Sequence, residues 1–259
     1  MSYYEVKEIY PWLHSIKDPM NVYMYLVVGE KRALLYDTGH GIAPIEPVIK
    51  EITNLPFDVV LGHGHIDHAN GAYQFDQAWI HEEDIELCLR HTSKTARRRV
   101  LEGLENPPEG FDAEAYIKSG SGNLKKLEEG HVFDLGGLQA EVVMMEGHTR
   151  GSIGLLIQEK RMLLNSDAAN THVWMFLKES MQIADYISML ERTINLPFDN
   201  FIVGHNDNPF PKEEYFRKFI DVAKNICVEK SKPYGAIPEL KGMIYQEGNA
   251  AIVFSKNKL

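Results

Sequence analysis

Two short sequence patterns recur in the same order along this chain, and this repetition constrains its fold more than any other feature. Residues 30–37 (EKRALLYD) resemble residues 159–167 (EKRMLLNSD), and residues 54–63 (NLPFDVVLGH) resemble residues 195–205 (NLPFDNFIVGH). The first pattern predicts a β-hairpin that ends in an aspartate, and the second predicts a buried strand that ends in Gly-His. Words this short can match by chance, but two that recur in order favour a fold built from two related halves.

The repeat suggests how the chain is organised. We expect a single domain over residues 1–259, with related halves at about 20–80 and 132–259 and a helical insertion or lid at about 82–129. Because the second half carries about a dozen extra residues after Asp167, the two halves are unequal. Hydrophobic spacing and breakers predict helices at 45–52, 82–104, 113–118, 183–194 and 212–229, and hairpins at 132–145 and 243–254.

The charge balance argues against a nucleic-acid partner. The formal net charge is -10 and 25% of the residues are charged, so the surface repels polyanions. The one basic run, Lys94 with Arg97, Arg98 and Arg99, is interpreted as a solvated helix face. With 44% hydrophobic residues, the chain has the composition of a globular protein.

The chain shows no sign of secretion or membrane insertion. Its first twelve residues lack a basic region followed by an apolar stretch, and no segment reaches about 18 uninterrupted apolar residues. Cys88 and Cys227 lie far apart and match neither a disulfide framework nor a thiolate zinc site, so two buried free thiols are expected. We therefore expect a cytoplasmic protein.

The densest chemical feature is the segment His63-Gly64-His65-Ile66-Asp67-His68, which follows an apolar strand. A lone histidine after a strand is usually a satisfied polar residue, but four ligand-type side chains in six residues indicate a metal site. Imidazoles with carboxylates suit zinc and related first-row ions, whereas calcium calls for oxygen ligands alone. Gly64 is expected to let the loop turn tightly.

The second half supplies complementary ligands. His148 lies in Gly-His-Thr-Arg-Gly-Ser, while Asp167 and His205 each follow an apolar strand. Together with the first motif, this order of segments resembles the metallo-β-lactamase superfamily and looks closest to its glyoxalase II-like members. The resemblance covers nearly the whole chain and implies an α/β fold, an αβ/βα four-layer sandwich of two mixed β-sheets flanked by helices.

The resemblance also implies a binuclear metal site. One ion would be held by His63, His65 and His148, the other by Asp67, His68 and His205, with Asp167 bridging both. Asp37 matches a family aspartate that orients a ligand histidine from beneath, although a plain turn residue is the alternative. Redox members of the superfamily have a glutamate where His65 stands, and no basic residues match those that grip glutathione in true glyoxalase II.

Such a site implies a metal-dependent hydrolase for a small-molecule ester, thioester or lactone. Two divalent ions, zinc in the first instance and iron or manganese otherwise, would share a bridging hydroxide as the nucleophile. Asp67 would be the catalytic residue that shuttles a proton to the leaving group. The alternatives are a phosphodiesterase for a small phosphodiester, a mononuclear-iron persulfide dioxygenase and a catalytically silent metal-binding regulatory protein.

Substrate choice is expected to depend on the extra segment after Asp167 and on the insertion, because loops on a rigid scaffold usually carry specificity. His172, Trp174 and Phe176 are the candidate pocket residues. The aromatic pair could instead pack a lid or a dimer contact. The expected partner is a small-molecule substrate, and a homodimer is left open.

Overall fold

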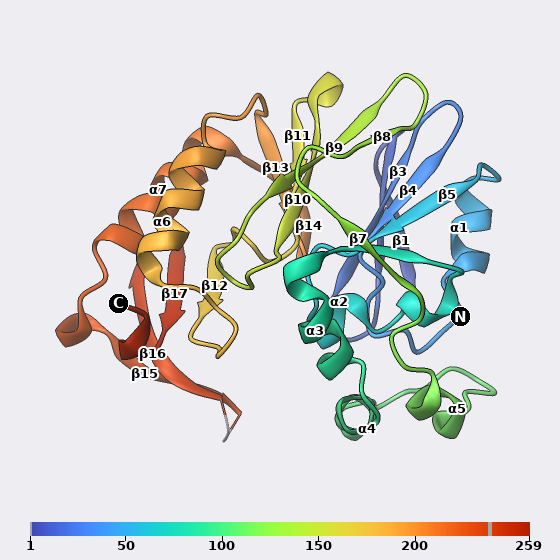
Figure 1. Cartoon of the computed structure of the whole chain (residues 1–259), viewed down its shortest axis with the longest axis horizontal. Coiled ribbons are helices and arrows are strands. Elements are labelled where there is room, and N and C mark those ends of the chain that lie inside the picture. The colour runs from blue at the N-terminus through green and yellow to red at the C-terminus, as the bar shows by residue number, and fades with distance from the viewer. Residues whose placement is uncertain (1, 238–239) are drawn as a thin grey trace.

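Two mixed β-sheets form the centre of the computed structural model, which describes residues 2–237 and 240–259 (Figure 1). The first sheet has seven strands in chain order. Its first four strands pair antiparallel and its last four pair parallel, so that β4 takes part in both arrangements. The strands are β1 (Glu5–Tyr10), β2 (Leu13–Lys17), β3 (Tyr23–Val28), β4 (Ala33–Tyr36), β5 (Phe57–Val60), β6 (Ala78–His81) and β7 (Leu124–Leu127).

The second sheet has six strands in the order β14-β13-β11-β10-β9-β8. Only β11 and β13 pair parallel, and the remaining neighbours are antiparallel. The strands are β8 (Val132–Asp134), β9 (Gln139–Met144), β10 (Ile153–Ile157), β11 (Met162–Leu164), β13 (Asn200–Val203) and β14 (Asn206–Pro211).

Helices cover the outer faces of both sheets. In Figure 1, α1 (Glu46–Ile52) lies outside the first sheet, and α6 (Ile183–Thr193) and α7 (Lys212–Lys224) lie outside the second. Helices α2 (Ile66–Ala69) and α3 (Glu82–His91) lie at the lower edge of the first sheet in this view. The layers therefore follow the order helix, sheet, sheet, helix, and the predicted αβ/βα sandwich is confirmed.

Strand β4 shows why the core has separate layers. Leu34 and Tyr36 pack between the sheets, while Ala33 and Leu35 point to the other face, towards α1. Side chains alternate along a strand, so a strand covered on both faces must be apolar throughout. All four residues of β4 are fully buried, as this rule requires.

The two repeated segments adopt matching arrangements. Strands β3 and β4 form the first predicted hairpin and β10 and β11 the second, and each second strand pairs parallel with the Gly-His strand that follows it. An arginine–aspartate pair ties the hairpin to that strand in each half. Arg32 contacts Asp58 at 2.7 Å, and Arg161 contacts Asp199 at 2.5 Å.

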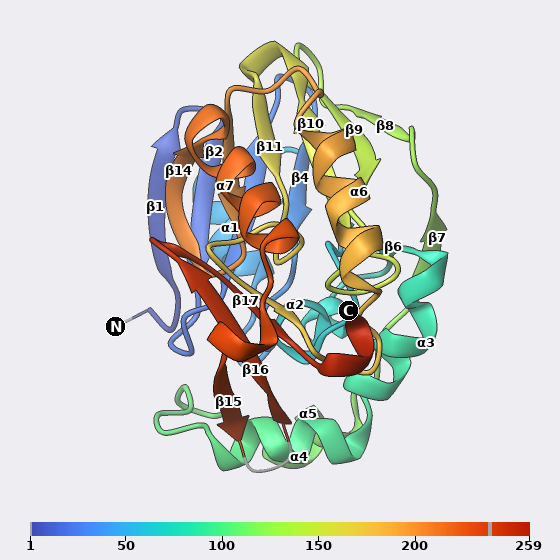
Figure 2. The same ribbon diagram turned by 90° about the vertical axis from the view of Figure 1, so that its left-hand side faces the viewer.

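A third sheet was not expected from the sequence. The extra residues after Asp167 form β12 (His172–Met175), which pairs parallel with β17 (Ala250–Phe254) in the order β12-β17-β16-β15. Figure 2 shows β15 (Lys232–Ile237), β16 (Leu240–Glu247) and β17 as a separate sheet below α7. The predicted hairpin at 243–254 is confirmed in β16 and β17. Strand β12 was missed because its partner lies far along the chain.

Residues 82–129 contain helices and one sheet strand. The helix expected over 82–104 is divided into α3 and α4 (Lys94–Glu102), because Ser93 caps α4 by accepting a hydrogen bond from the Ala96 amide. Helix α5 (Ala113–Lys118) lies where it was predicted. Strand β7 then extends the first sheet beside β6. No helix in the described ranges is long and apolar enough to cross a bilayer.

The interpretation of the basic run as a solvated face is wrong for Arg97. Its side chain is fully buried, with the guanidinium between the rings of Tyr73 and Tyr116 at 4.8 and 4.7 Å from their centroids. Three backbone carbonyls accept hydrogen bonds from it, those of Asn70, Thr92 and Gly120. The Nε and Nη2 atoms of this planar cation make these hydrogen bonds while its face contacts the two rings, whereas Lys94, Arg98 and Arg99 remain exposed.

The cysteines also differ from the expectation of two buried thiols. Cys88 is fully buried on α3, but Cys227 is only partly buried. Both are free, in agreement with the sequence reading.

Candidate metal centre

The first motif lies where β5 ends at the lower edge of the first sheet. His63 is the third residue after β5, and His65 is the N-cap residue immediately before α2. Helix α2 then carries Asp67 and His68. A strand end followed by one short helical turn therefore presents all four side chains in one place.

The second half brings its ligands to the same place from three loops. His148 lies between β9 and β10, Asp167 follows β11, and His205 lies between β13 and β14. The seven predicted ligand residues form two neighbouring groups, and within each group one potential ligand atom per residue lies within 4.8 Å of the others. The groups are His63, His65 and His148, and Asp67, His68, Asp167 and His205.

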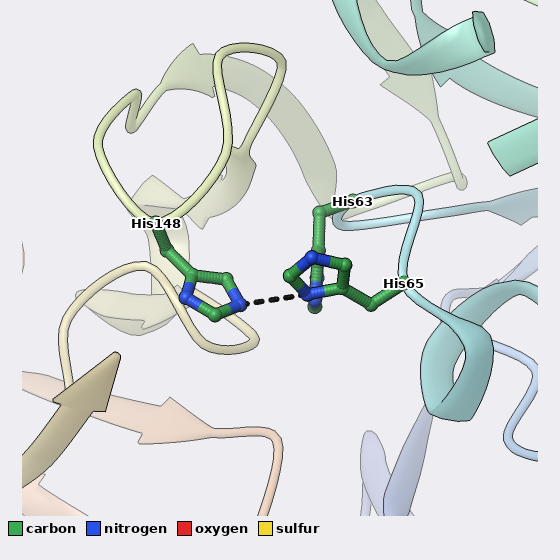
Figure 3. A group of neighbouring side chains, drawn as sticks. All are labelled: His63, His65 and His148. Atoms are coloured by element: carbon green, nitrogen blue, oxygen red, sulfur yellow. Dashed lines mark hydrogen bonds between the residues drawn. The ribbon is translucent and has the colours of Figure 1, made fainter. Parts of the chain in front are cut away.

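His65 and His148 face each other through ring nitrogens that carry no protons. Figure 3 shows their rings with His63 and the 2.9 Å separation between His148 Nε2 and His65 Nδ1. His148 Nδ1 donates to the Trp174 carbonyl at 2.7 Å, and His65 Nε2 donates to Glu179 Oε1 at 2.9 Å. A neutral imidazole has one N–H, so both facing nitrogens present lone pairs. That opposition is unfavourable unless a cation binds there.

The tautomer of His63 follows from the same reasoning. Ser166 has one hydroxyl proton, which it donates to the Asp37 carboxylate at 2.7 Å. Ser166 Oγ therefore accepts from His63 Nδ1 at 3.2 Å, which leaves a lone pair on His63 Nε2. That Nε2 is buried and has no partner among the residues that the structure describes.

His68 and His205 complete the pattern in the second group. His68 Nδ1 donates to Asp37 at 2.9 Å, and His205 Nδ1 donates to the Asn21 carbonyl at 3.0 Å. Their Nε2 atoms face carboxylate oxygens of Asp67 and Asp167 at 3.2–3.6 Å. Asp37 thus contacts a candidate ligand histidine, as predicted.

The donor set fits metal ions. Each of the five histidines has one nitrogen engaged by an outer acceptor and the other turned inward, the arrangement that metal-ligating histidines adopt. Within the described ranges, His68 Nε2 and Asp167 Oδ1 are also buried without a hydrogen-bond partner. Nitrogen and carboxylate donors of this kind suit zinc, iron and manganese.

The electrostatics differ between the two groups. Burial and the neighbouring histidines lower the pKa of His148 to about 4 and hold the pKa of His63 well below its usual value. The carboxylate of Asp167 instead raises the pKa of His205 to about 9. Burial opposes ionisation of Asp67, but His68 and His205 outweigh it and hold its pKa well below the ordinary value. The first group thus consists of imidazoles alone, and the second mixes imidazoles with carboxylates.

Two glycines allow the loops to approach closely. A Cβ on Gly204 would lie 2.6 Å from His68 Cε1 and 2.7 Å from Asp167 Oδ1, so only glycine fits before His205. Gly64 was expected to permit a tight turn, but its constraint is contact with α3. There a Cβ would lie 2.8 Å from the Asp84 carbonyl oxygen and the Cys88 nitrogen.

Asp84 joins the two ligand loops and was missed at the sequence level. Its buried carboxylate accepts from the Gly64 amide at 2.8 Å, from the Thr149 hydroxyl at 2.7 Å and from the Gly151 amide at 2.8 Å. The Thr and Gly that follow His148 are therefore explained by a shared acceptor on α3. An aspartate in the first turn of a predicted helix gives no sign of such a role.

Glu179 and His91 were also missed. Glu179 accepts from His65, and the His91 ring lies 5.0 Å from that of His65. The hydrogen bond from His65 outweighs burial and lowers the pKa of Glu179 to about 2, so it is a carboxylate. Burial lowers the pKa of His91 to about 4. The only sequence signal for Glu179 is that it lies in the extra segment after Asp167.

The candidate pocket residues are only partly brought together. Trp174 contacts Phe176 and Tyr234 with ring centroids 5.3 and 6.1 Å apart, and its carbonyl accepts from His148. Phe176 is buried against Gly242, which is a packing position. His172 is exposed, and no hydrogen bond joins it to either group within the described ranges.

Comparisons with known proteins agree with this geometry. The sequence profile of the Metallo-beta-lactamase superfamily matches residues 18–207. The chain is 26% identical over 212 residues to the human acyl-coenzyme A thioesterase MBLAC2, covering 75% of this chain and 76% of that protein. It is 28% identical over 146 residues to the hydroxyacylglutathione hydrolase GloC of Haemophilus influenzae, covering 53% and 61%.

A solved structure supports the same fold. A metallo-beta-lactamase family protein of Thermus thermophilus superposes with a TM-score of 0.59 at 20% identity, over 82% of this chain and 79% of that one. The fold, the order of the motifs and the matched profile agree, and the chain belongs to the metallo-beta-lactamase superfamily.

Proposed function

We propose that this chain is a metal-dependent hydrolase that cleaves small acyl thioesters with two divalent ions, in the first instance zinc. One ion would be held by His63, His65 and His148, and the other by Asp67, His68 and His205, with Asp167 shared. The observation that carries the proposal is the inward orientation of five imidazole nitrogens beside two carboxylates. Metal ions would compensate these converging polar atoms, whereas burying them without a partner is energetically unfavourable.

When bound, the ions supply a hydroxide nucleophile at neutral pH and polarise the carbonyl oxygen of the substrate. A side chain of the protein would carry the proton of the attacking water. Asp67 Oδ2 lies 3.3 Å from His68 Nε2 and 3.5 Å from His205 Nε2, on the inner side of the second group. Its lowered pKa keeps it ionised, so it can accept the proton of the attacking water and deliver it to the leaving thiolate. The products are one carboxylic acid and one thiol.

The choice of thioesters rests on the curated relatives. Both are named for thioester substrates, an acyl-coenzyme A in one case and a hydroxyacylglutathione in the other. A thiolate is a good leaving group, so the reaction needs little beyond a nucleophile, an electrophilic site for the carbonyl and a proton. The site offers residues for each of these tasks.

Trp174 is the residue we propose for contact with the acyl group. It is half-buried, and its backbone carbonyl accepts a hydrogen bond from His148 of the first group. Tyr234 extends the same aromatic cluster. Phe176 supports the cluster from beneath, and His172 lies at its exposed side.

The test is a substrate panel on protein whose metal content has been measured. It contains an acyl-coenzyme A, a hydroxyacylglutathione, a lactone, a β-lactam and bis-p-nitrophenyl phosphate. We expect thiol release from at least one thioester, and loss of that activity in the His63→Ala variant. Exposed His131 provides the matched control, since His131→Ala should leave turnover unchanged.

Other outcomes would replace the proposal with a specific alternative. Cleavage of bis-p-nitrophenyl phosphate alone would indicate a phosphodiesterase. Oxygen consumption with glutathione persulfide would indicate a dioxygenase that uses one iron. A metal-loaded protein that turns over no member of the panel would be a binding protein.

A further inference from the structure

Five outer acceptors fix the five inward-facing histidines, and one of the side chains among them belongs to no sequence motif discussed above. That acceptor is Glu179, in the loop between β12 and α6. We propose that Glu179 is a positioning residue, which holds the Nδ1 atom of His65 on the first ion by accepting a hydrogen bond from its Nε2. This inference rests on the metal group proposed above, but not on the identity of the substrate.

The ring of His65 is held from both sides. Its Nε2 lies 2.9 Å from Glu179 Oε1, and its Nδ1 lies 2.9 Å from His148 Nε2. A flip of the ring, or a proton on the wrong nitrogen, would remove the inward lone pair. Glu179 can only accept, so it requires the proton to be on Nε2 and leaves Nδ1 free to bind metal.

His91 supports the same orientation. Its ring lies 5.0 Å from that of His65 with an interplanar angle of 32°. The Ile66 amide donates to His91 Nδ1 at 3.2 Å, so a neutral His91 carries its proton on Nε2. His65, His91 and Glu179 are close enough to hold a third ion. The protonated Nε2 argues against that role and favours packing.

The loop that carries Glu179 is itself attached to the His148 loop. The Ser180 hydroxyl donates to the His148 carbonyl at 2.9 Å, and the Met181 amide donates to the Gly147 carbonyl at 2.8 Å. Lys258 donates to the carbonyls of Lys178 and Ser180 from the other side. Residues 174–181 therefore orient two of the three nitrogens in the first group, through the Trp174 carbonyl and Glu179.

The experiment compares Glu179→Ala with Glu179→Gln and with a control. Glu86→Ala is the matched control, because Glu86 lines the same surface cavity as Glu179 but is exposed and contacts no ligand. Metal affinity is measured for zinc by competition with a chromophoric chelator. The Co²⁺-loaded proteins are then compared by their d–d absorption, which reports the geometry at the ion rather than activity. Unfolding of the metal-free proteins checks that all variants fold.

We expect Glu179→Ala to weaken the binding of one ion about 10- to 100-fold and to change the Co²⁺ spectrum. Glu179→Gln keeps an oxygen that can accept the hydrogen bond, so its metal affinity and its Co²⁺ spectrum should be closer to those of the wild type. The control should match the wild type. Affinity and spectrum unchanged in Glu179→Ala, or Gln no better than Ala, would overturn the proposal. A third ion that is lost in both Glu179→Ala and His91→Ala would also overturn it, since Glu179 would then be a ligand.

These measurements separate the inference from the proposed function. Wild-type protein that binds ions but releases no thiol would defeat the thioesterase assignment and leave the role of Glu179 testable. Wild-type protein that binds no ion at the first group would defeat both.

Discussion

Ser166 donates a hydrogen bond to Asp37 at 2.7 Å, and this bond joins the two halves of the molecule behind the metal centre. The offset of 129 residues that aligns the repeated hairpins also relates these two residues. Both have left-handed backbones, with φ of 65° for Asp37 and 48° for Ser166. Asp37 then contacts His68, and Ser166 contacts His63, so one hydrogen bond couples a ligand of each group.

Replacing Asp37 with alanine should both destabilise the fold and weaken metal binding. Three donors would lose their acceptor, the Gly62 amide, the Ser166 hydroxyl and His68 Nδ1. Each buried donor without a partner costs about 1–3 kcal/mol, so we expect the free energy of unfolding to fall by about 3 kcal/mol or more. Urea unfolding measures this change, with Asp76→Ala at an exposed site as the control. A loss below about 1 kcal/mol would show that Asp37 is a plain turn residue.

Removing the metal should lower the melting temperature. His65 Nδ1 and His148 Nε2 lie 2.9 Å apart, and a cation between them would relieve the repulsion of their lone pairs. An ion at 100 times its Kd adds about 2.7 kcal/mol to the stability of the folded state. Differential scanning fluorimetry with and without a strong chelator measures the shift, and added zinc should restore it. The shift should shrink in His63→Ala and remain in His131→Ala, and equal melting curves with and without chelator would count against a metal site.

Replacing Asp67 should cost more activity than metal. Asp67→Ala removes the group proposed to carry the proton, while six other ligands remain. General acid–base catalysis contributes about 10²- to 10⁴-fold, so kcat should fall by at least about 100-fold. Metal content by mass spectrometry should fall much less. If Asp67→Ala keeps full turnover with both ions bound, another group moves the proton.

The sequence predicted those parts of the site that depend on local pattern. His63, His65, Asp67 and His68 lie in one dense motif, and the other three ligands, His148, Asp167 and His205, each follow an apolar strand. The role of Asp37 was inferred from the resemblance to the superfamily. The strand ends and the order of the motifs are features that a single sequence displays.

The outer acceptors could not be predicted in the same way. Glu179 and Asp84 contact the ligand loops only through tertiary packing, and the Trp174 contact to His148 uses a backbone carbonyl that any residue has. Trp174 was named as a candidate pocket residue because of its aromatic side chain, which gives no indication that its carbonyl accepts from His148. The pairing of β12 with β17 could not be predicted either, because parallel pairing between distant segments leaves no local pattern in the sequence.

Arg97 should contribute far more to stability than its exposed neighbour Arg98. Arg97→Ala removes hydrogen bonds to three backbone carbonyls, two of them buried, and two cation–π contacts, so we expect a loss of about 3 kcal/mol or more. Arg98→Ala should change stability by about 0.5 kcal/mol at most. Arg97→Lys should be intermediate, because an ammonium keeps the charge but not the planar fork. Urea unfolding of the three variants checks the order, and equal values for Arg97→Ala and Arg98→Ala would contradict it.

The two cysteines should differ sharply in reactivity. Burial and the nearby Asp84 raise the pKa of Cys88 to about 12, so its thiol remains protonated at pH 8, whereas Cys227 is partly exposed. A thiol reagent should label one cysteine quickly in the native protein and the second only on unfolding, because the thiolate is the reactive form. Cys227→Ser should remove the fast phase. Because the folded state raises this pKa, its contribution to stability is present below about pH 9 and is lost as the pH rises towards 12. Two fast-reacting thiols at pH 8 would mean that the α3 packing opens readily in solution.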